Sequence, residues 1–196
     1  MQEKQVTIGD ETFKVDKPFL VLATQNPIEQ EGVYALPEAQ LDRFMLKVQV
    51  GYNTLEEEFE IVNRVAKNGF ETIKQVLNDE EIQKLQKAIQ DIHVDEEIQK
   101  YMLKIIFATR YPKDYNLGEY AQYIESGASP RASIDLYNAS KAMALLRGKE
   151  YVTPLDIAYV VTNVLQHRIS LSYKAQAKGI TPKDIVQKIL EVIKAP

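Results

Sequence analysis

Two segments in the second half of the chain begin with the same signal for the start of a helix. Residues 152–157 (VTPLDI) and 180–185 (ITPKDI) both place a threonine before a proline, with an acid three residues after the threonine. The threonine can accept hydrogen bonds from free backbone amides, the proline suits the first helical turn, and the acid favours the positive end of the helix dipole. The signal predicts two helices, although it is too short to indicate a repeat protein.

Other helix signals fill most of the chain after residue 70. Asn78 is a predicted N-cap with Glu81 three residues later, and Asp95 is expected to open a second helix. An alanine-rich helix is predicted over 130–146. The polar, tyrosine-rich stretch 110–127 between these helices is predicted to be a loop that packs onto the bundle, in preference to a stacking platform for nucleic acid.

The first residues have a different pattern. Residues flanking Gly9-Asp10 predict a β-hairpin. The apolar run that follows does not alternate, which predicts a strand over 19–24 covered on both faces, as in a parallel sheet. Asn26 comes after this strand, where open α/β sheets bind ligands. An asparagine before proline is also ordinary turn chemistry, so both interpretations stay open here.

A short helix and a further strand are predicted after Pro37. The helix covers 38–44, and the alternating residues 45–50 are typical of a strand. Thr54 with Glu57 predicts another capped helix, with Phe59, Val62 and Ala66 as its apolar stripe. We therefore expect a small α/β unit over 1–70, followed by an all-α bundle over 71–196.

Composition excludes several classes of function. The chain has no cysteine, which excludes disulfides, zinc thiolates and cysteine nucleophiles, and its only histidines are His93 and His167. We expect His93 to be a packing or surface residue and His167 to be a cation at a helix end. A net charge of −4 argues against nucleic-acid binding. No apolar run approaches the roughly 20 residues of a membrane helix, and no signal-peptide core is present, so we expect a cytoplasmic protein without membrane insertion.

Arginine is scarce relative to lysine, so each arginine is a candidate for a role that needs its fixed, permanent charge. Arg131 lies at the start of the alanine-rich helix, where a cation opposes the helix dipole, which suggests an anionic partner. For Arg43 and Arg131, a functional role and an ordinary surface or ion-pair role stay equally open. The ordinary role is favoured for the others, Arg64, Arg110, Arg147 and Arg168.

Three longer stretches carry a specific resemblance. The stretch LATQNPIEQEGVYALPEAQLDRFMLKVQVGYN resembles the MoxR branch of the AAA+ ATPases, and SGASPRASIDL and LLRGKEYVTPLDI resemble the lid of the same family, in the same order. The resemblance implies an α+β fragment: the C-terminal portion of a P-loop AAA+ α/β core over 1–70, then an all-helical lid over 71–196. It also implies ATP and Mg²⁺ as cofactors of the full-length protein.

The resemblance also implies roles for three residues. Asn26 matches sensor 1, the polar residue beside the γ-phosphate that helps to place the attacking water. Arg43 matches the arginine finger, which in this family acts on ATP bound to the neighbouring subunit of a ring. Arg131 matches sensor 2, which reaches from the lid to the nucleotide of its own subunit.

The phosphate loop and the magnesium-binding acidic pair of such ATPases are missing from the sequence. A phosphate loop needs G-x-x-x-x-G-K-[ST], whereas Gly148-Lys149 is followed by Glu150. The best candidate for the acidic pair, in 92–96, follows an interrupted apolar run, so no metal ligand is assigned. The family places both elements upstream of the hairpin, so we expect this chain to be a C-terminal part whose Met1 is an internal methionine or a truncated start. We expect no meaningful ATP hydrolysis by the chain alone, and apolar surface exposed where sheet neighbours are lacking.

Three functions remain open. The first is a ring-forming ATPase, a hexamer, that remodels or matures client complexes together with von Willebrand factor A domain proteins. The second is a non-catalytic helical interaction module or adaptor derived from the AAA+ fold. The third moves the chain toward magnesium-chelatase or DNA-helicase relatives; the acidic composition and the NPIEQEG stretch favour MoxR over those.

Overall fold

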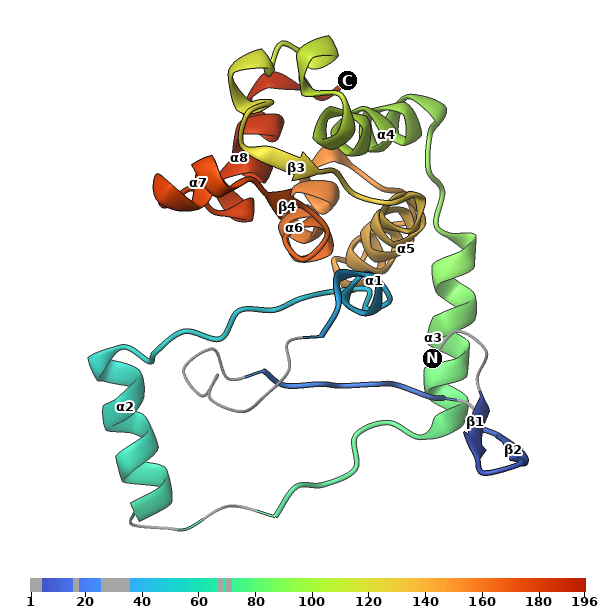
Figure 1. Ribbon diagram of the computed structural model, residues 1–196. Helices are drawn as coiled ribbons and strands as arrows, with labels where there is room; N and C mark the ends of the chain where they lie inside the picture. The colour runs from blue at the N-terminus through green and yellow to red at the C-terminus, as the bar shows by residue number, and fades with distance from the viewer. Residues whose placement is uncertain (1–4, 16–17, 26–35, 67–68, 70–71) are drawn as a thin grey trace.

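The computed structural model describes residues 5–15, 18–25, 36–66, 69 and 72–196. Its C-terminal half is a compact helical bundle, whereas its N-terminal half consists of short elements joined by long extended segments (Figure 1). All buried hydrophobic side chains of the described residues lie between Ile92 and Ile193. The bundle is therefore the part of the chain with a hydrophobic core of its own.

The bundle is built from α4 (Glu96–Arg110), α5 (Pro130–Leu146), α6 (Pro154–Leu165), α7 (Tyr173–Ala177) and α8 (Pro182–Val192). Its largest fully buried apolar side chains come from four of these helices: Ile105, Ile106, Leu136, Ile157, Val161, Val164, Leu165, Ile185, Val186 and Ile189. Burying each such side chain stabilises a fold by about 1.5–3 kcal/mol. None of the described helices has the length and apolar character needed to cross a membrane.

The predicted helix starts are confirmed at the level of single hydrogen bonds. The backbone amides of Thr153 and Thr181 each donate to the carboxylate three residues later, over 2.8 Å. The backbone amide of Asn78 likewise donates to Glu81 over 2.8 Å, at the start of α3 (Asp79–Asp91). Each contact satisfies one backbone amide that the helix itself leaves free.

The tyrosine-rich stretch carries more structure than the predicted loop. It contains two short 3₁₀ helices, η2 (Pro112–Tyr115) and η3 (Gly118–Tyr120), and then strand β3 (Ile124–Ser126). Strand β3 pairs antiparallel with β4 (Ser170–Leu171), so the bundle is not purely helical. Tyr123 is buried and Tyr115 and Tyr120 pack against the core, which confirms that this stretch packs onto the bundle.

The N-terminal half contains the predicted hairpin of β1 (Gln5–Ile8) and β2 (Glu11–Lys14), which pair antiparallel. Gly9 in its turn has a φ of 62°, a conformation that glycine adopts without strain. Helix α1 (Glu38–Leu41) follows. Helix α2 (Leu55–Ile61) comes next, with its predicted Thr54–Glu57 capping box, and continues into the π-helical turn η1 (Val62–Ala66).

Three predictions for this half are wrong. Residues 19–24 and 45–50 form no strands; both are extended and largely exposed, with Leu22 85% and Val50 93% exposed. A strand needs a neighbour to complete its ladder of hydrogen bonds, and no described strand lies beside either segment. The helix predicted over 38–44 ends earlier, because the chain turns at Asp42 and Arg43.

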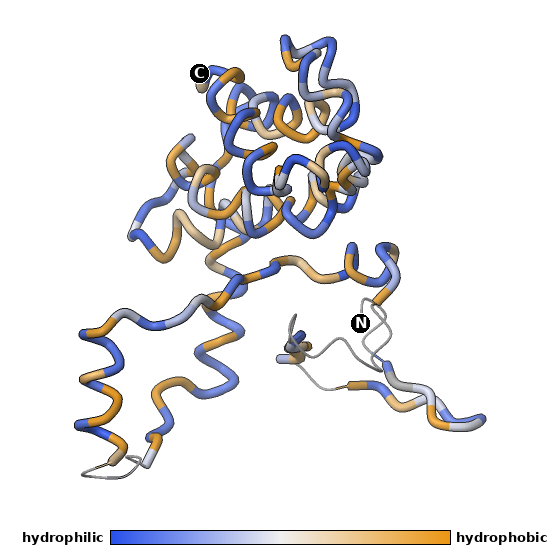
Figure 2. Tube along the Cα trace, turned by 60° about the vertical axis from the view of Figure 1, so that its left-hand side comes forward, coloured by the Kyte–Doolittle hydropathy of each residue, from blue (hydrophilic) through white to orange (hydrophobic). Residues whose placement is uncertain are grey.

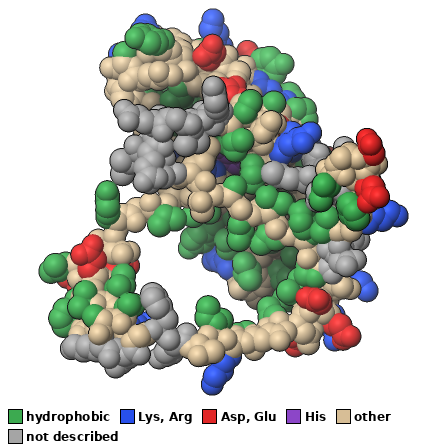
Figure 3. All heavy atoms as spheres, turned by 60° about the horizontal axis from the view of Figure 1, so that its bottom comes forward, with side chains coloured by type: hydrophobic (Ala, Val, Ile, Leu, Met, Phe, Trp, Pro, Cys, Tyr) green, Lys and Arg blue, Asp and Glu red, His purple; other side chains and the backbone are tan. Residues whose placement is uncertain are grey.

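The apolar surface expected from missing sheet neighbours is present. Hydrophobic residues lie along α2 and the extended segments in the coloured trace (Figure 2), and they gather on the outside of the molecule in this region (Figure 3). Phe59 and Val62, predicted as part of an apolar stripe, are 71% and 58% exposed. The stripe exists in the sequence, but nothing described in the structure covers it.

Candidate functional site

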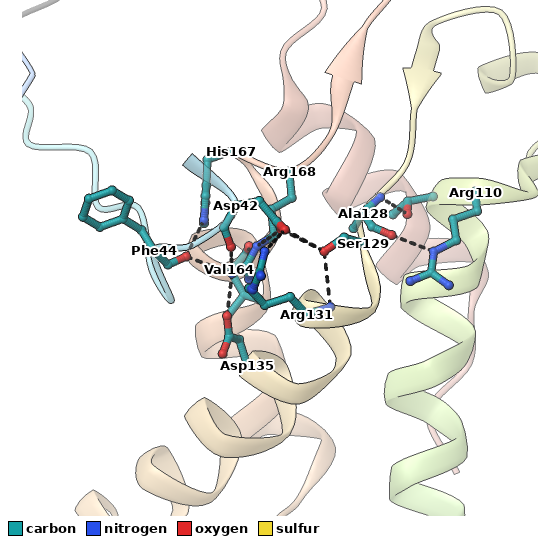
Figure 4. Close-up of polar contacts among 11 residues, drawn as sticks. Asp42, Phe44, Arg110, Ala128, Ser129, Arg131, Asp135, Val164, His167 and Arg168 are labelled. Atoms are coloured by element: carbon teal, nitrogen blue, oxygen red, sulfur yellow. Dashed lines mark hydrogen bonds and ion pairs between the residues drawn. The ribbon is translucent and has the colours of Figure 1, made fainter. Parts of the chain in front are cut away.

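A cluster of charged side chains joins the end of α1 to the helical bundle (Figure 4). Its centre is Asp42, which is at the C-terminal end of α1 and is mostly buried. The carboxylate of Asp42 faces two elements of the bundle: the start of α5 and the segment that follows α6. We call the set Asp42, Ser129, Arg131, Asp135, His167 and Arg168 the junction.

The start of α5 contributes Ser129 and Arg131 to the junction. Ser129 is the N-cap of α5, and its hydroxyl donates to the Asp42 carboxylate over 2.9 Å while accepting from the Arg131 amide over 3.2 Å. The Arg131 guanidinium donates to Asp42 Oδ2 over 2.5 Å. Asp42 is therefore the anionic partner that the position of Arg131 at a helix N-terminus suggests.

Arg168 contributes the deepest charge of the junction. Its side chain is fully buried and pairs with two carboxylates, those of Asp42 and Asp135. Nε donates to Asp42 Oδ1 over 3.0 Å, and Nη2 donates to Asp135 Oδ2 over 2.5 Å. A buried cation is tolerated where carboxylates and further hydrogen bonds satisfy it, as they do here.

His167 lies beside Arg168 and is not the cation that the sequence suggested. Burial lowers the pKa of the His167 imidazole, and the charges of Arg168 and Lys47 act in the same direction, although the hydrogen bond to Phe44 opposes them. Its Nε2 donates to the carbonyl of Phe44 over 2.8 Å, and its buried Nδ1 has no hydrogen-bond partner among the described residues. Both observations fit a neutral ring that carries its proton on Nε2.

Backbone contacts extend the junction along residues 38–47. The Lys47 amide donates to the carbonyl of Asn163 over 2.8 Å, and Gln166 donates to the carbonyl of Lys47. At the other end, the hydroxyl of Ser170 donates to Glu38 over 2.6 Å. These contacts join segments more than a hundred residues apart in sequence. They hold both ends of residues 38–47, with Arg43 between them, against the bundle.

The structure places the three predicted site residues differently. Arg131 lies in the junction. Arg43 lies next to it with an exposed side chain, which forms no hydrogen bond or ion pair within the described part of the chain. Asn26 lies outside the described residues, so its predicted place at a strand end remains a prediction.

The ordinary ion-pair role predicted for the other arginines is confirmed for Arg64 and Arg147. Arg64 pairs with Glu60 on the surface of α2, and Arg147 pairs with the buried Asp156 over 2.9 Å. Arg110 donates to the carbonyl of Ala128 over 2.6 Å. Arg168 is also in ion pairs, but its central position in the junction was not predicted; its sequence signal, a lone arginine after a histidine at a helix end, does not reveal its partners.

The junction is an anion-binding corner in which the anion is supplied by the chain itself. The Asp42 carboxylate lies at the N-terminus of α5, where a backbone dipole, a serine hydroxyl and Arg131 all favour negative charge. Arg131 remains 31% exposed and so can also face a ligand. Arg43, one residue from Asp42, is presented to the outside by the same turn.

Comparison with known proteins matches both halves of the chain to AAA families. Residues 1–46 match the ATPase family associated with various cellular activities (AAA), and residues 120–189 match the AAA lid domain. The chain is 42% identical to the chaperone MoxR1 of Mycobacterium tuberculosis, over all of this chain and 52% of that protein. It is 39% identical to the uncharacterized protein YeaC of Bacillus subtilis, over all of this chain and 59% of that protein.

A solved structure supports the same assignment. A crystal structure of a putative ATPase from Cytophaga hutchinsonii superposes with a TM-score of 0.93 at 44% identity, over all of this chain and 59% of that one. The chain thus spans a little over half the length of these relatives. The extended segments of the N-terminal half and the helical lid both fit the C-terminal portion of such proteins. The chain belongs to the MoxR branch of the AAA+ ATPases.

Proposed function

We propose that this chain is the C-terminal part of a MoxR-type ATPase and supplies its lid and the end of its core that carries the arginine finger. The full-length protein would use ATP hydrolysis to remodel or mature client protein complexes. The observation that carries the proposal is the exposed side chain of Arg43. The preceding residue, Asp42, fixes this position because its carboxylate forms ion pairs with Arg131 and Arg168 of the lid. A permanent cation that is held at one place and turned outward can act on a neighbouring molecule.

In this proposal Arg43 is the arginine finger for ATP bound to the next subunit of a ring, a hexamer. Its planar, always-charged group would stabilise charge that develops on the transferred phosphoryl group. Fingers supplied in trans raise turnover by about 10³–10⁵. The exposure of Arg43 supports this role, because a finger that serves a neighbour cannot be buried within its own subunit.

Arg131 is the proposed sensor 2, which reports the nucleotide of its own subunit to the lid. The corner where it lies already binds an anion, the Asp42 carboxylate, so its donors suit a phosphate in charge and geometry. Asn26 is the proposed sensor 1, because an amide can donate to phosphate and accept from water without changing charge. Mg²⁺ would neutralise phosphate charge in the full-length protein, but we assign it no ligand in this chain.

The chain on its own is proposed not to hydrolyse ATP, because its 196 residues hold no G-x-x-x-x-G-K-[ST] motif. Activity would belong to a full-length cytoplasmic protein that contains such a loop. Von Willebrand factor A domain proteins are the proposed partners of the assembled ring. This partner assignment rests on the family alone.

The test replaces Arg43 with alanine in the full-length protein and measures ATP turnover and ATP affinity separately. We expect turnover to fall at least about a thousandfold, within the range for a lost finger, while the dissociation constant of ATP changes by less than about threefold. The matched control is Arg64→Ala, which removes an exposed arginine paired only with Glu60. Normal turnover in the Arg43 variant would contradict the finger assignment, whereas a wild-type full-length protein without ATP turnover would leave the non-catalytic interaction module as the better description.

A further inference from the structure

Arg168 donates hydrogen bonds to backbone carbonyls as well as to the carboxylates of Asp42 and Asp135. Its guanidinium donates to five acceptors: the carboxylates of Asp42 and Asp135 and the backbone carbonyls of Asp42, Phe44 and Val164. Nη2 alone faces three of these acceptors with two hydrogens, so one hydrogen is shared. Every nitrogen of this fully buried side chain is therefore committed.

Two of these acceptors flank Arg43. Nη2 of Arg168 lies 2.9 Å from the carbonyl oxygen of Asp42 and 2.9 Å from the carbonyl oxygen of Phe44. His167 donates to the same Phe44 carbonyl over 2.8 Å. The backbone on both sides of Arg43 is thus held by the fully buried Arg168 and the partly buried His167, while the Arg43 side chain itself is exposed.

We propose that Arg168 is the positioning residue for Arg43, and that it sets the direction in which Arg43 leaves the subunit. This inference rests on the proposed function of Arg43. A charged group stabilises a transition state only if its geometry is set beforehand, and a misplacement of about 1 Å can cost roughly a hundredfold in rate. Arg168 supplies that geometry through the two flanking carbonyls and never touches nucleotide itself.

Lysine cannot replace arginine in this role. The guanidinium has five donors in a fixed plane, which lets one group reach three carbonyls and two carboxylates at once. A lysine ammonium keeps the buried charge but offers three donors around a single nitrogen. Arg168→Lys therefore preserves the ion pairing in part while loosening the carbonyls on either side of Arg43.

The first experiment measures kcat for ATP hydrolysis and the dissociation constant of ATP in the full-length protein with Arg168→Lys. We expect kcat to fall at least tenfold and the ATP dissociation constant to stay within about twofold, since Arg168 is not proposed to contact nucleotide. Arg147→Lys is the matched control, because Arg147 also pairs with a buried carboxylate of the lid but makes no contact with residues 42–44. An unchanged kcat in Arg168→Lys would overturn the inference.

A double variant separates positioning from simple stability. If Arg168 acts through Arg43, then Arg168→Lys should not slow an Arg43→Ala protein any further, because there is no finger left to position. A further fall of tenfold in the double variant would mean that Arg168 acts by another route. Normal turnover in Arg43→Ala alone would instead contradict the proposed function of Arg43, so the single variant distinguishes that failure from a failure of the Arg168 inference.

Hydrogen exchange gives a readout that does not depend on activity. The Arg43 amide donates to the carbonyl of Gln40 over 3.1 Å. We expect this amide and that of Phe44 to exchange at least tenfold faster in Arg168→Lys, with the α8 amides unchanged. If Arg168→Lys does not fold, the charge-balanced variant Arg168→Met with Asp135→Asn removes the donors without leaving an unpaired charge, and it should show the same loss of kcat and the same faster exchange. Wild-type exchange in that variant would contradict the proposal.

Discussion

The guanidinium of Arg131 and the carboxylate of Asp42 are in direct contact, although the two residues are 89 positions apart in the sequence. This contact brings the first turn of α5 to the end of α1, and Arg168 completes it from the other side. The same carboxylate therefore serves two arginines, and the lid and the segment that carries Arg43 are one structural unit.

Asp42→Ala is expected to destabilise this unit strongly. The substitution leaves the buried Arg168 with one carboxylate instead of two, and removing one partner of a buried ion pair costs about 3–5 kcal/mol. Because Asp42 keeps 17% exposure, we expect the lower end of that range in urea unfolding. Glu60→Ala, at an exposed pair, is the control and should change stability by less than about 1 kcal/mol. Equal losses of stability in Asp42→Ala and Glu60→Ala would show that the junction contributes no more than an exposed ion pair.

Acid is expected to weaken the junction through His167. Burial lowers the pKa of His167 below its ordinary 6.5, so the unfolded chain takes up a proton at a higher pH than the folded one. The stabilisation from a neutral His167 is complete above about pH 6.5 and is lost as the pH falls through the window between 6.5 and the lower pKa of the folded state. Unfolding at pH 7.5 and 5.5 should show a smaller loss of stability in His167→Gln than in the wild type. The same loss in both proteins would contradict this assignment.

The two matching helix starts give a test with an internal control. Burial acts to raise the pKa of Asp156, but hydrogen bonds from Thr153 and the charges of Lys149 and Arg147 hold it below its ordinary value. The carboxylate of Asp184 accepts the same two hydrogen bonds, from the amide and the hydroxyl of Thr181, at an exposed site. We expect Asp156→Ala to cost about 3 kcal/mol in the free energy of unfolding, and Asp184→Ala about 1 kcal/mol. Similar costs would mean that Asp156 stabilises the fold through its capping contacts alone, without a contribution from its burial or its ion pairs.

Gly127 is expected to tolerate no side chain. A Cβ at this position would lie 2.4 Å from the carbonyl oxygen of Thr109, which is backbone and cannot rotate away. Gly127→Ala should therefore lower the free energy of unfolding by about 1–3 kcal/mol, as overpacking does. Gly118→Ala meets nothing within 4 Å and should change it by less than about 0.5 kcal/mol. A small effect at both positions would show that the segment after β3 can shift.

The lid was predictable because its signals are local. Caps such as Thr181–Asp184 and the start of α5 at Pro130 depend on residues within one turn, and the structure reproduces them. The strands at 19–24 and 45–50 were predicted wrongly, because a strand depends on a neighbour that no local pattern supplies. The junction was missed for the same reason: nothing near Asp42 in sequence indicates that Arg168 is its partner.

The most direct test of the central claim asks whether Arg43 acts on a neighbouring subunit. Full-length Arg43→Ala protein is mixed with full-length protein whose phosphate-loop lysine is replaced, each inactive alone, and ATP hydrolysis is measured across mixing ratios. We predict that mixtures regain turnover, with a maximum near equal amounts, because one variant supplies an intact finger and the other an intact nucleotide site at a shared interface. Mixtures that hydrolyse ATP no faster than the separate variants would contradict the account.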